Sequence, residues 1–348
     1  MSVVLDQISE TVPGGAEQVV VCNDRATGMR AVIAVDDTTL GPGLGGVRWM
    51  PYPDQEAAVA EACRLARGMT LKNALAGIPY GGAKSVILRE GAGADRTAVM
   101  RAFGRFVKQL GGAYVPGVDM GTTIDDLAEI GRVAPDVSCD HEDPSPWTAL
   151  GVFAGIRAAV AHLDHTDLKG VRVAVQGAGH VGSVLAGLLA EAGAEVVVAD
   201  VDEARADRLA TDVGGRAVDP AEVLTFDCDV LAPCATARVV DHRSLGRLSC
   251  RVVAGGANDV LADHACAAEL AARGVTYVPD FLLNAGGVIQ IHALRAGWDD
   301  GQLRRSVLEI GDRAAEVLDR AAATSRLPVE VAEDLASERL GRTVTIPV

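Results

Sequence analysis

Three residues in the first half of the chain are of the types that acid–base chemistry on a small molecule requires. Lys72 follows GMTL, Lys84 follows the glycines of YGGA, and Asp119 closes the apolar run AYVPGV. Two lysines brought together in a shielded site repel each other, and burial disfavours both charges, so one should release its proton readily. The other could keep its charge and bind a carboxylate. Either lysine alone is more typical of a solvated surface, but the glycines beside both favour a site.

A second pattern, from Val173 to Asp200, is typical of a βαβ unit that binds a dinucleotide. Gly177, Gly179 and Gly182 have the spacing GxGxxG between two apolar runs. Such glycines permit a tight turn, close approach of a pyrophosphate and close packing of helix on strand. Asp200 lies 18 residues after Gly182, where a carboxylate can bind the adenine ribose and repel a 2′-phosphate. The sequence therefore predicts NAD as the cofactor in preference to NADP.

Local patterns predict the elements that position the three polar residues. Residues 17–35 should form a β-hairpin, since two β-rich runs flank a turn. Asp54 is a suitable N-cap for a helix that should stop at Gly68, which places Lys72 just past the helix end. Further elements expected in this half are a strand opening at Lys84, a helix over residues 96–110, a strand ending at Asp119 and a helix capped by Thr122 or Thr123.

The second half of the chain has the alternation of a parallel sheet. Residues 135–146 are polar and contain three prolines, so they are the predicted linker between two domains. Strands and helices then alternate, as in a sheet with helices on both faces. Strands should end near Pro233 and Asn258, and residues 274–290 should form a further strand and a glycine loop. Two helices should close the chain.

We therefore predict an α/β fold of two domains with a cleft between them. An N-terminal α/β substrate domain should span residues 1–144, and a Rossmann doubly wound domain that binds NAD should span residues 145–325. The C-terminal helix, residues 326–348, should pack back on the first domain.

The composition excludes several classes of partner. The chain has 348 residues, of which 49% are hydrophobic and 23% charged, as expected for a globular protein of about two domains. The formal net charge of −15 disfavours nucleic acid and anionic membranes as partners. No apolar run reaches the ~18 residues of a membrane helix. The segment MSVVLDQISE lacks the pattern of a signal peptide, so a cytoplasmic location is expected.

Cysteine and histidine spacing gives no indication of a metal site. The seven cysteines are scattered, odd in number and never in CxxC spacing, which indicates small buried thiols in a reducing compartment. The seven histidines form no ligand-like cluster along the sequence, so each is predicted to be a surface or loop residue.

Taken together, these motifs resemble the glutamate/leucine/phenylalanine/valine dehydrogenase family, in particular its shorter branched-chain and aromatic amino acid members. The lysine pair, 12 residues apart, is the most specific feature. The resemblance implies NAD-dependent, reversible oxidative deamination of an L-amino acid to its 2-oxo acid and ammonia, in a homo-oligomer. The matching segments follow the family order from about residue 17 to residue 295: LGPGLGGVR, GMTLKN, GGAKSV, VDMGTT, PSPWTALGV, QGAGHVG, APCA, AGGAND and PDFLLNAGGVIQ.

The resemblance also implies roles for individual residues. Lys72 would bind the substrate carboxylate beside the backbone of Gly45 and Gly46. Lys84 would activate the attacking water, and Asp119 would move protons to and from the amino group. The hydride chemistry would belong to the cofactor, while the protein supplies orientation and a dry site.

Cofactor contacts are implied in the same way. Thr148 would face the carboxamide, Asn258 would hold the substrate beside the nicotinamide, and Asp200 with Arg205 would border the adenosine ribose. The full set implied in cofactor binding is Thr148, Gly177, Ala178, Gly179, His180, Val181, Gly182, Asp200, Val201, Arg205, Cys234, Ala235, Gly256, Ala257 and Asn258.

The side-chain pocket is implied to lie near Leu44, Gly117, Val288 and Ile291. Glycine at position 117 is typical of phenylalanine enzymes, whereas alanine is common in leucine and valine enzymes, so extra room for a ring is expected. Val288 favours branched aliphatic substrates instead. One methylene in such a pocket is worth only ~1–3 kcal/mol, so both classes stay open, with a slight preference for a large or aromatic side chain.

Several positions depart from the family pattern. Ala83 replaces a third glycine, and Asp259 replaces a second asparagine. Residues 236–238 read TAR where LGG is usual, and the loop CDHEDPSP is short and acidic. These departures concern the geometry of the cofactor loops and leave the predicted catalytic residues in place.

Two other functions are compatible with parts of the sequence. A catalytically silent NAD-binding regulator could keep the fold, but it would require the lysine pair to be lost or solvated. A two-domain dehydrogenase for another substrate class, such as a folate or a hydroxy acid, would more naturally carry a catalytic histidine. His180, inside the glycine loop, is poorly placed for that task.

Overall fold

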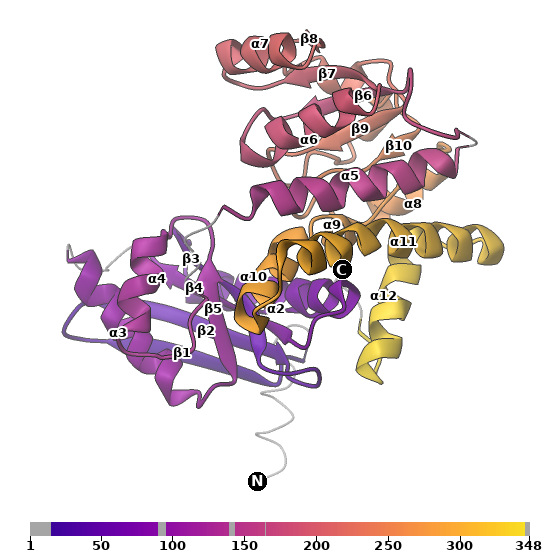
Figure 1. The fold of residues 1–348 in the computed structure, drawn as a ribbon. Helices are drawn as coiled ribbons and strands as arrows, with labels where there is room; N and C mark the ends of the chain where they lie inside the picture. The colour runs from indigo at the N-terminus through magenta and orange to yellow at the C-terminus, as the bar shows by residue number, and fades with distance from the viewer. Residues whose placement is uncertain (1–14, 90–94, 139–142, 164, 345–348) are drawn as a thin grey trace. The chain divides into compact units, whose positions relative to one another are not determined.

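The computed structural model describes residues 15–89, 95–138, 143–163 and 165–344, which fold into two compact units. Of these described residues, unit 1 comprises those from 15 to 138 together with 336–344, and unit 2 comprises those from 143 to 335. Figure 1 shows the sheet of each unit with its helices. Each unit has its own sheet and its own buried core.

Unit 1 is built on a mixed five-stranded sheet in the order β1-β2-β4-β3-β5. The predicted hairpin is confirmed, because β1 and β2 pair antiparallel across a turn. Strand β4 is antiparallel to β2 and parallel to β3, which in turn is parallel to β5. The strands are β1 (Gln18–Asp24), β2 (Met29–Asp37), β3 (Gly43–Met50), β4 (Gly81–Leu88) and β5 (Tyr114–Val118).

Helices cover both faces of this sheet, because the central runs of β2 and β4 bury side chains on both sides. Ile33 and its alternate neighbours pack with α3 (Arg96–Gln109) and α4 (Ile124–Gly131). Val32 and the residues of the opposite alternation pack with α2 (Gln55–Ala76). Burial on both faces explains why apolar residues follow one another in the run from Ala31 to Val35 without polar alternation.

The helix capped by Asp54 does not end at Gly68, so its predicted C-terminal end is wrong. Helix α2 continues through Gly68 to Ala76 and ends at Gly77, whose φ of 79° is left-handed. A Cβ at position 68 would meet no atom within 4 Å, and glycine inside a helix only weakens it by about 1 kcal/mol. Gly77 ends the helix because glycine adopts the left-handed cap conformation without steric cost. Lys72 therefore lies inside α2 and not beyond it.

Unit 2 is built on a parallel six-stranded sheet in the order β11-β10-β9-β6-β7-β8. The order reverses beside β6, the first strand of the unit, as in Rossmann folds. The predicted βαβ unit is confirmed, with α6 (His180–Glu191) between β6 and β7. The strands are β6 (Arg172–Gln176), β7 (Glu195–Ala199), β8 (Arg216–Ala217), β9 (Val230–Pro233), β10 (Val252–Val253) and β11 (Thr276–Tyr277).

The glycine loop predicted within residues 274–290 is a helix. Gly286 opens α10 (Gly286–Ala296), directly after α9 (Asp280–Leu283). A Cβ at Gly286 would lie 2.0 Å from the carbonyl oxygen of Trp147 in α5 (Ser145–Ala161). This glycine therefore allows close packing of two helices and makes no turn. The remaining helices of unit 2 are α7 (Glu203–Asp212), α8 (Ala265–Ala272), α11 (Asp300–Thr324) and the short 3₁₀ turns Val223–Thr225 and Leu245–Arg247.

Helix α12 (Pro328–Leu340) carries the chain from unit 2 back to unit 1. Just beyond it, the Nε of Arg342 donates to Asp37 Oδ2 over 2.6 Å at the end of β2. Among the described residues, no helix is both long and apolar enough to span a bilayer.

Candidate functional site

Lys84, Asp119 and Arg48 form a charged cluster in unit 1. The Nζ of Lys84 lies 3.1 Å from Asp119 Oδ1, and the Nε of Arg48 donates to Asp119 Oδ2 over 2.7 Å. All three side chains are at most 18% exposed. The second guanidinium branch of Arg48 pairs with Glu61 Oε1 over 2.8 Å. The cluster therefore alternates two cations with two carboxylates.

Strand register brings these side chains to one face. Lys84 shares the face of β4 that packs on α2, because it alternates with Val86 of that core. Arg48 points to the same side of β3 and reaches Glu61 on α2. Asp119 follows directly on the last residue of β5, as the sequence predicts.

Gly46 leaves the space in which the cluster forms. A Cβ at this position would lie 2.6 Å from the Cβ of Asp119 and 3.3 Å from the Nζ of Lys84. Gly46 is paired with Gly117 of β5, so the two strands are bare at this point. The absence of both side chains opens the sheet surface beside Lys84.

Asp119 is held as a carboxylate. Burial raises its pKa, but the charges of Lys84 and Arg48 outweigh that effect, so the pKa lies below the ordinary value. An ionised carboxylate between two cations is a hydrogen-bond and proton acceptor, as a group facing a substrate ammonium would need to be.

Lys72 lies near the C-terminal end of α2 and is half-buried. Its neighbour Asn73 is fully buried and donates to the carbonyl oxygens of Gly81, over 2.6 Å, and Leu44, over 3.3 Å. A Cβ at Gly82 would lie 2.1 Å from the Oγ1 of Thr70. These close contacts fix the last turns of α2 against β3 and β4.

Arg48 and Glu61 are members of the cluster that sequence reasoning did not assign. Arg48 closes the motif LGPGLGGVR, and its place two residues after Gly46 puts it on the same strand face. That alternation is a usable signal. Glu61 gives no such signal, because only the packing of α2 on the sheet brings it to Arg48.

In unit 2, the glycine loop is tightly packed at Gly177 and Gly182 and has free space at Gly179, as binding of a pyrophosphate requires. A Cβ at Gly177, whose φ is 106°, would lie 2.8 Å from Ala235 Cβ, and one at Gly182 would lie 1.9 Å from the Gly177 carbonyl oxygen. A Cβ at Gly179 would meet nothing within 4 Å. Gly179 is also the N-cap of α6, and no side chain caps that helix. Its first N–H groups are therefore available to an anion.

Asp200 follows β7 and bonds to the glycine loop. Its Oδ2 accepts the N–H of Ala178 over 2.7 Å, and its Oδ1 accepts the N–H of Asp202 over 2.9 Å. Burial raises the pKa of Asp200, but these two N–H groups outweigh that effect, so the pKa is lowered. Each carboxylate oxygen keeps one further lone pair for a ribose hydroxyl. Arg205 lies 4.0 Å away, and Val201 is 92% exposed.

The other predicted cofactor residues lie at the carboxyl ends of β9 and β10 and at the start of α5 and α6. Thr148 is in the first turns of α5, where its Oγ1 donates to the Pro144 carbonyl oxygen. His180 is 85% exposed, with its Nδ1 3.7 Å from Asp143. The further members in these segments are Val181, Cys234, Ala235, Gly256, Ala257 and Asn258.

Asn258 is oriented by a residue that sequence reasoning did not assign. Asn284, which ends α9, donates from its Nδ2 to Asn258 Oδ1 over 2.9 Å and to the Ala257 carbonyl oxygen over 3.2 Å. Asn284 is 6% exposed, whereas Asn258 is exposed. Asn284 lies in the quoted segment PDFLLNAGGVIQ, but no pattern indicates that it bonds to a residue 26 positions earlier.

The predicted pocket residues are divided between the units. Leu44 and Gly117 are buried on neighbouring strands of unit 1, and a Cβ at Gly117 would meet only Ser138 Oγ, at 3.8 Å. Val288 and Ile291 lie three residues apart on α10 of unit 2, so they share one helix face and are half-buried.

Two departures from the family pattern have left-handed backbones. Arg238 has a φ of 55° and Asp259 a φ of 52°, in a region that glycine and asparagine tolerate better than most residues. The N–H of Arg238 donates to the carbonyl oxygen of Asp259 over 2.6 Å. This hydrogen bond thus links the segment around Arg238 to the segment around Asp259.

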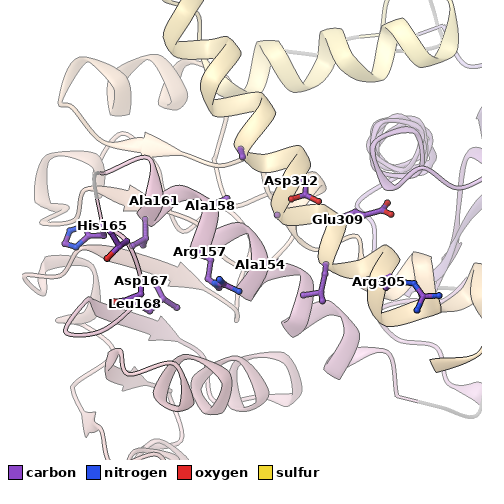
Figure 2. Close-up of a pocket in the computed structure, with 15 residues that line it drawn as sticks. Ala154, Arg157, Ala158, Ala161, His165, Asp167, Leu168, Arg305, Glu309 and Asp312 are labelled. Atoms are coloured by element: carbon purple, nitrogen blue, oxygen red, sulfur yellow. The ribbon is translucent and has the colours of Figure 1, made fainter. Parts of the chain in front are cut away.

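A separate pocket of about 650 Å³ lies between α5 and α11 of unit 2 (Figure 2). Its labelled lining includes Arg157, Arg305 and Asp312, together with several alanines. None of the predicted site residues lines it. Its lining shares no residue with the glycine loop.

Comparisons with known proteins identify the same family that the sequence motifs resemble. A family model described as the Glu/Leu/Phe/Val dehydrogenase dimerisation domain matches residues 16–133, and the Glutamate/Leucine/Phenylalanine/Valine dehydrogenase model matches residues 142–204 and 201–294. Leucine dehydrogenase of Bacillus subtilis (strain 168) is 38% identical over 94% of this chain and 92% of its own length. Valine dehydrogenase of Streptomyces virginiae is 39% identical over 97% of both.

A solved structure gives the same picture for the fold. The crystal structure of L-tryptophan dehydrogenase from Nostoc punctiforme is similar with a TM-score of 0.85 and 35% identity, and the match covers 97% of this chain and 98% of that one. The similarity therefore extends over both units and all the motifs described above.

Proposed function

Because the chain belongs to the glutamate/leucine/phenylalanine/valine dehydrogenase family and is an amino acid dehydrogenase, we propose that it oxidatively deaminates hydrophobic L-amino acids with NAD. The observation that carries this proposal is the buried cluster of Lys84, Asp119 and Arg48 against the bare surface at Gly46. Burying paired charges costs free energy, and a catalytically silent NAD-binding regulator would gain nothing from that cost. The cluster therefore favours an enzyme.

The residues of unit 2 fit NAD. The uncapped start of α6 and the open position at Gly179 suit a pyrophosphate, and Asp200 suits an unphosphorylated ribose. A 2′-phosphate beside Asp200 would meet a carboxylate whose pKa is already lowered, so NADP is disfavoured. The exposed Val201 offers an apolar surface to an adenine. Family members are NAD(P)-dependent dehydrogenases, and these features support the proposal of NAD for this chain.

In the proposed mechanism, the chain binds the substrate and moves protons. The Lys72 ammonium binds the substrate carboxylate beside Gly45 and Gly46, and Asp119 accepts a proton from the substrate ammonium. Bound NAD supplies the hydride acceptor for the Cα hydrogen. Once Lys84 has released its own proton to solvent, its neutral amine takes a proton from the water that attacks the imine carbon. Asp119 then returns its proton to the amino nitrogen of the carbinolamine. The C–N bond breaks, the hydroxyl proton leaves with the ammonia, and the 2-oxo acid remains. Arg48 holds Asp119 in place through both steps.

For the substrate side chain, we propose a hydrophobic group with a preference for large or aromatic ones. Gly117 supports this preference, because among the residues that the structure describes only Ser138 limits the space beside its Cα. Leu44, Val288 and Ile291 would supply apolar contacts. None of these lining residues is basic, which disfavours an acidic substrate.

We also propose that the chain functions as a homo-oligomer. The part of unit 1 that matches a dimerisation domain includes β1, which is an edge strand of the described sheet. Val21 on this strand is 52% exposed. An edge strand with an exposed apolar side chain is a surface that proteins normally protect by pairing.

The proposal is tested by measuring NAD and NADP reduction with each of the twenty L-amino acids at alkaline pH. We expect the highest kcat/KM with phenylalanine, tryptophan, leucine or valine, and little activity with glutamate. Asp200→Ala should raise the NADP to NAD ratio of kcat/KM about tenfold, since one charge interaction is worth about 1.5 kcal/mol or more. Activity confined to acidic amino acids or hydroxy acids would contradict the proposed substrate class. An unchanged ratio of NADP to NAD activity in Asp200→Ala would contradict the proposed role of Asp200 in cofactor selection.

A further inference from the structure

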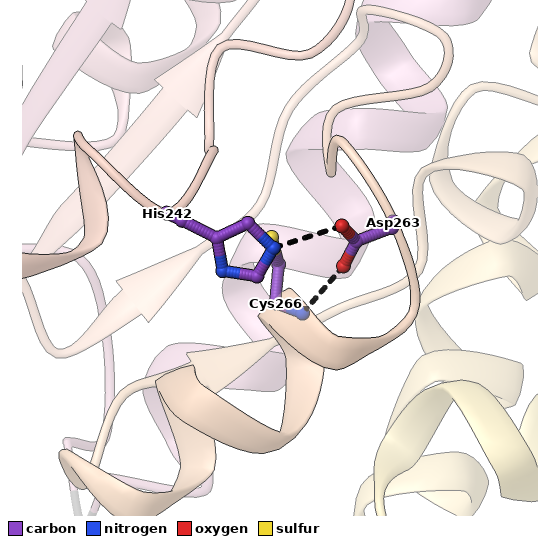
Figure 3. Close-up of side chains that lie close together, drawn as sticks. All are labelled: His242, Asp263 and Cys266. Carbon is purple, nitrogen blue, oxygen red and sulfur yellow. Dashed lines mark hydrogen bonds and ion pairs between the residues drawn. The ribbon is translucent and has the colours of Figure 1, made fainter.

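A second cluster of reactive side chains lies in unit 2, at the start of α8. His242, Asp263 and Cys266 each offer one ligand atom, and these atoms all lie within 4.8 Å of one another. Figure 3 shows the imidazole edge, the carboxylate and the sulfur grouped around one point. Sequence analysis predicted each histidine to be a surface or loop residue outside any ligand-like cluster. His242 is exposed, and the fold brings it beside Asp263 and Cys266, which are distant from it along the chain.

The backbone positions this cluster through a short parallel pairing. Val240 and Leu261 form a bridge, and the Val240 N–H donates to the Val260 carbonyl oxygen over 3.1 Å. His242 and Asp263 each lie two residues beyond a bridge partner, so the pairing sets their side chains next to each other. The buried Val240 belongs to the core of the unit, which anchors the pairing.

The first turn of α8 supplies the other groups. Asp263 Oδ1 accepts the N–H of Cys266 over 3.1 Å, which leaves Oδ2 to face His242 Nε2 at 2.9 Å. Glu269, one helical turn after Cys266, places its Oε1 2.9 Å from His242 Nδ1, where the carboxylate accepts the imidazole N–H. A carboxylate on Nδ1 orients the imidazole, so that Nε2 points at Asp263 and Cys266, as in many metal sites.

The dimensions suit a small tetrahedral cation. With bonds of ~2.0 Å to nitrogen and oxygen and ~2.3 Å to sulfur, tetrahedral ligand atoms lie roughly 3.3–3.6 Å apart. The ligand atoms lie within 4.8 Å of one another, so a bound cation would draw them together by up to about 1 Å. The side chains of His242 and Asp263, which are 53% and 40% exposed, have room for this movement. Cys266 is fully buried, which fixes the sulfur and limits the site to one open direction.

We propose that His242, Asp263 and Cys266 form a structural Zn²⁺ site, with Glu269 as the orienting carboxylate and water as the fourth ligand. One imidazole nitrogen, one thiolate and one carboxylate are a donor set that favours zinc over magnesium or calcium. Binding releases the Cys266 thiol proton and, when His242 is protonated, its Nε2 proton. The cation would tie the segment around His242 to α8, remote from the catalytic lysines in the sequence and in a different unit.

A charged histidine between two carboxylates is the competing arrangement. Hydrogen bonds to Asp263 and Glu269 raise the pKa of His242, so protons compete with a metal more strongly here than at an isolated histidine. The test is therefore done at mildly alkaline pH with metal-free full-length protein, titrated with Co²⁺ as a spectroscopic substitute for Zn²⁺. We expect one Co²⁺ per chain, with a thiolate-to-cobalt charge-transfer band and the visible bands of tetrahedral cobalt. Zn²⁺ should displace it and raise the Tm.

Matched variants identify the ligands. Cys266→Ser and His242→Ala should abolish the charge-transfer band and the Zn²⁺-dependent rise in Tm. Cys250→Ser, which changes another buried thiol of the same unit, and His162→Ala, which changes another exposed histidine beside a carboxylate, should keep both. Circular dichroism without metal checks that each variant is folded. Absence of the band in the parent protein, or its survival in Cys266→Ser, would overturn the proposal.

Discussion

Asp119 is the residue on which the charges of unit 1 converge. Its two oxygens are used by different cations, so its charge and its position are set separately by Lys84 and Arg48. A single ion pair would leave a carboxylate free to rotate, whereas two partners on opposite oxygens restrict it. This restriction is what a group that accepts a substrate proton at one fixed point requires.

Replacement of Arg48 tests this view. Arg48→Gln removes one of the two charges that lower the pKa of Asp119, so the pKa should rise. Because the carboxylate is then protonated at higher pH, the acid limb of the kcat/KM profile should move to higher pH. Arg64→Gln is the control, since Arg64 pairs with the same Glu61 but not with Asp119. A profile that moves equally in both variants would argue against a specific link to Asp119.

Lys84 and Lys72 should be separable by kinetics. Lys84→Ala should lower kcat roughly 10²- to 10⁴-fold, the usual contribution of an acid–base group, with little change in NADH binding. Lys72→Ala should raise the KM for the amino acid roughly 10- to 100-fold, because a charge-assisted hydrogen bond to the carboxylate is lost. Lys108→Ala, at an exposed lysine of α3, is the control. Substantial turnover in Lys84→Ala would exclude the proposed role.

Among the elements, β3 and α2 show two opposite uses of glycine. On β3, Gly46 keeps a side chain out of the space that the charged cluster occupies. On α2, Gly68 faces open space and has no steric task. The same residue type is therefore required by packing on the strand and is only tolerated on the helix.

Alanine at the two positions should have opposite effects on stability. Gly46→Ala places a Cβ 2.6 Å from Asp119 Cβ, which should lower the free energy of unfolding by about 2 kcal/mol and reduce activity. Gly68→Ala should raise the free energy of unfolding by about 0.5–1 kcal/mol, because alanine favours the helix. Urea denaturation followed by circular dichroism measures both. Equal effects of the two substitutions would refute the steric account of Gly46.

The glycine loop and β7 depend on each other. Asp200 bonds to the Ala178 N–H, so the residue that should select the ribose also holds the loop that should bind the pyrophosphate. This link joins the carboxyl ends of β6 and β7, which are adjacent strands of the sheet. One carboxylate thus serves the fold and the proposed cofactor site.

For the whole molecule, the exposed edge of unit 1 is the feature that bears on assembly. Val21→Lys puts a charge on β1 in place of an exposed apolar side chain, which should oppose pairing of this edge. We expect a lower molar mass by size-exclusion chromatography with light scattering. Leu294→Lys, at an exposed apolar residue of α10, should leave the mass unchanged. A monomeric parent protein, or an unchanged mass for Val21→Lys, would contradict the proposed interface.

The sequence by itself determined the features that depend on neighbouring residues. The βαβ unit, the hairpin and the strand ending before Asp119 follow from apolar periodicity, turn residues and glycine spacing, all of which act over a few positions. The motif order was sufficient to identify the family, which the comparisons confirm. The helix end at Gly68 was misplaced because glycine permits a helix end but does not impose one.

Only the tertiary structure decided which residues distant along the chain meet. Arg48 and Asp119 are 71 positions apart, and Asn258 and Asn284 are 26 apart, so no local pattern contains their hydrogen bonds. The cluster at His242 was missed for the same reason. Strand register and helix packing place these side chains, and both are set by the burial of apolar faces over the whole unit, which periodicity along the chain does not specify.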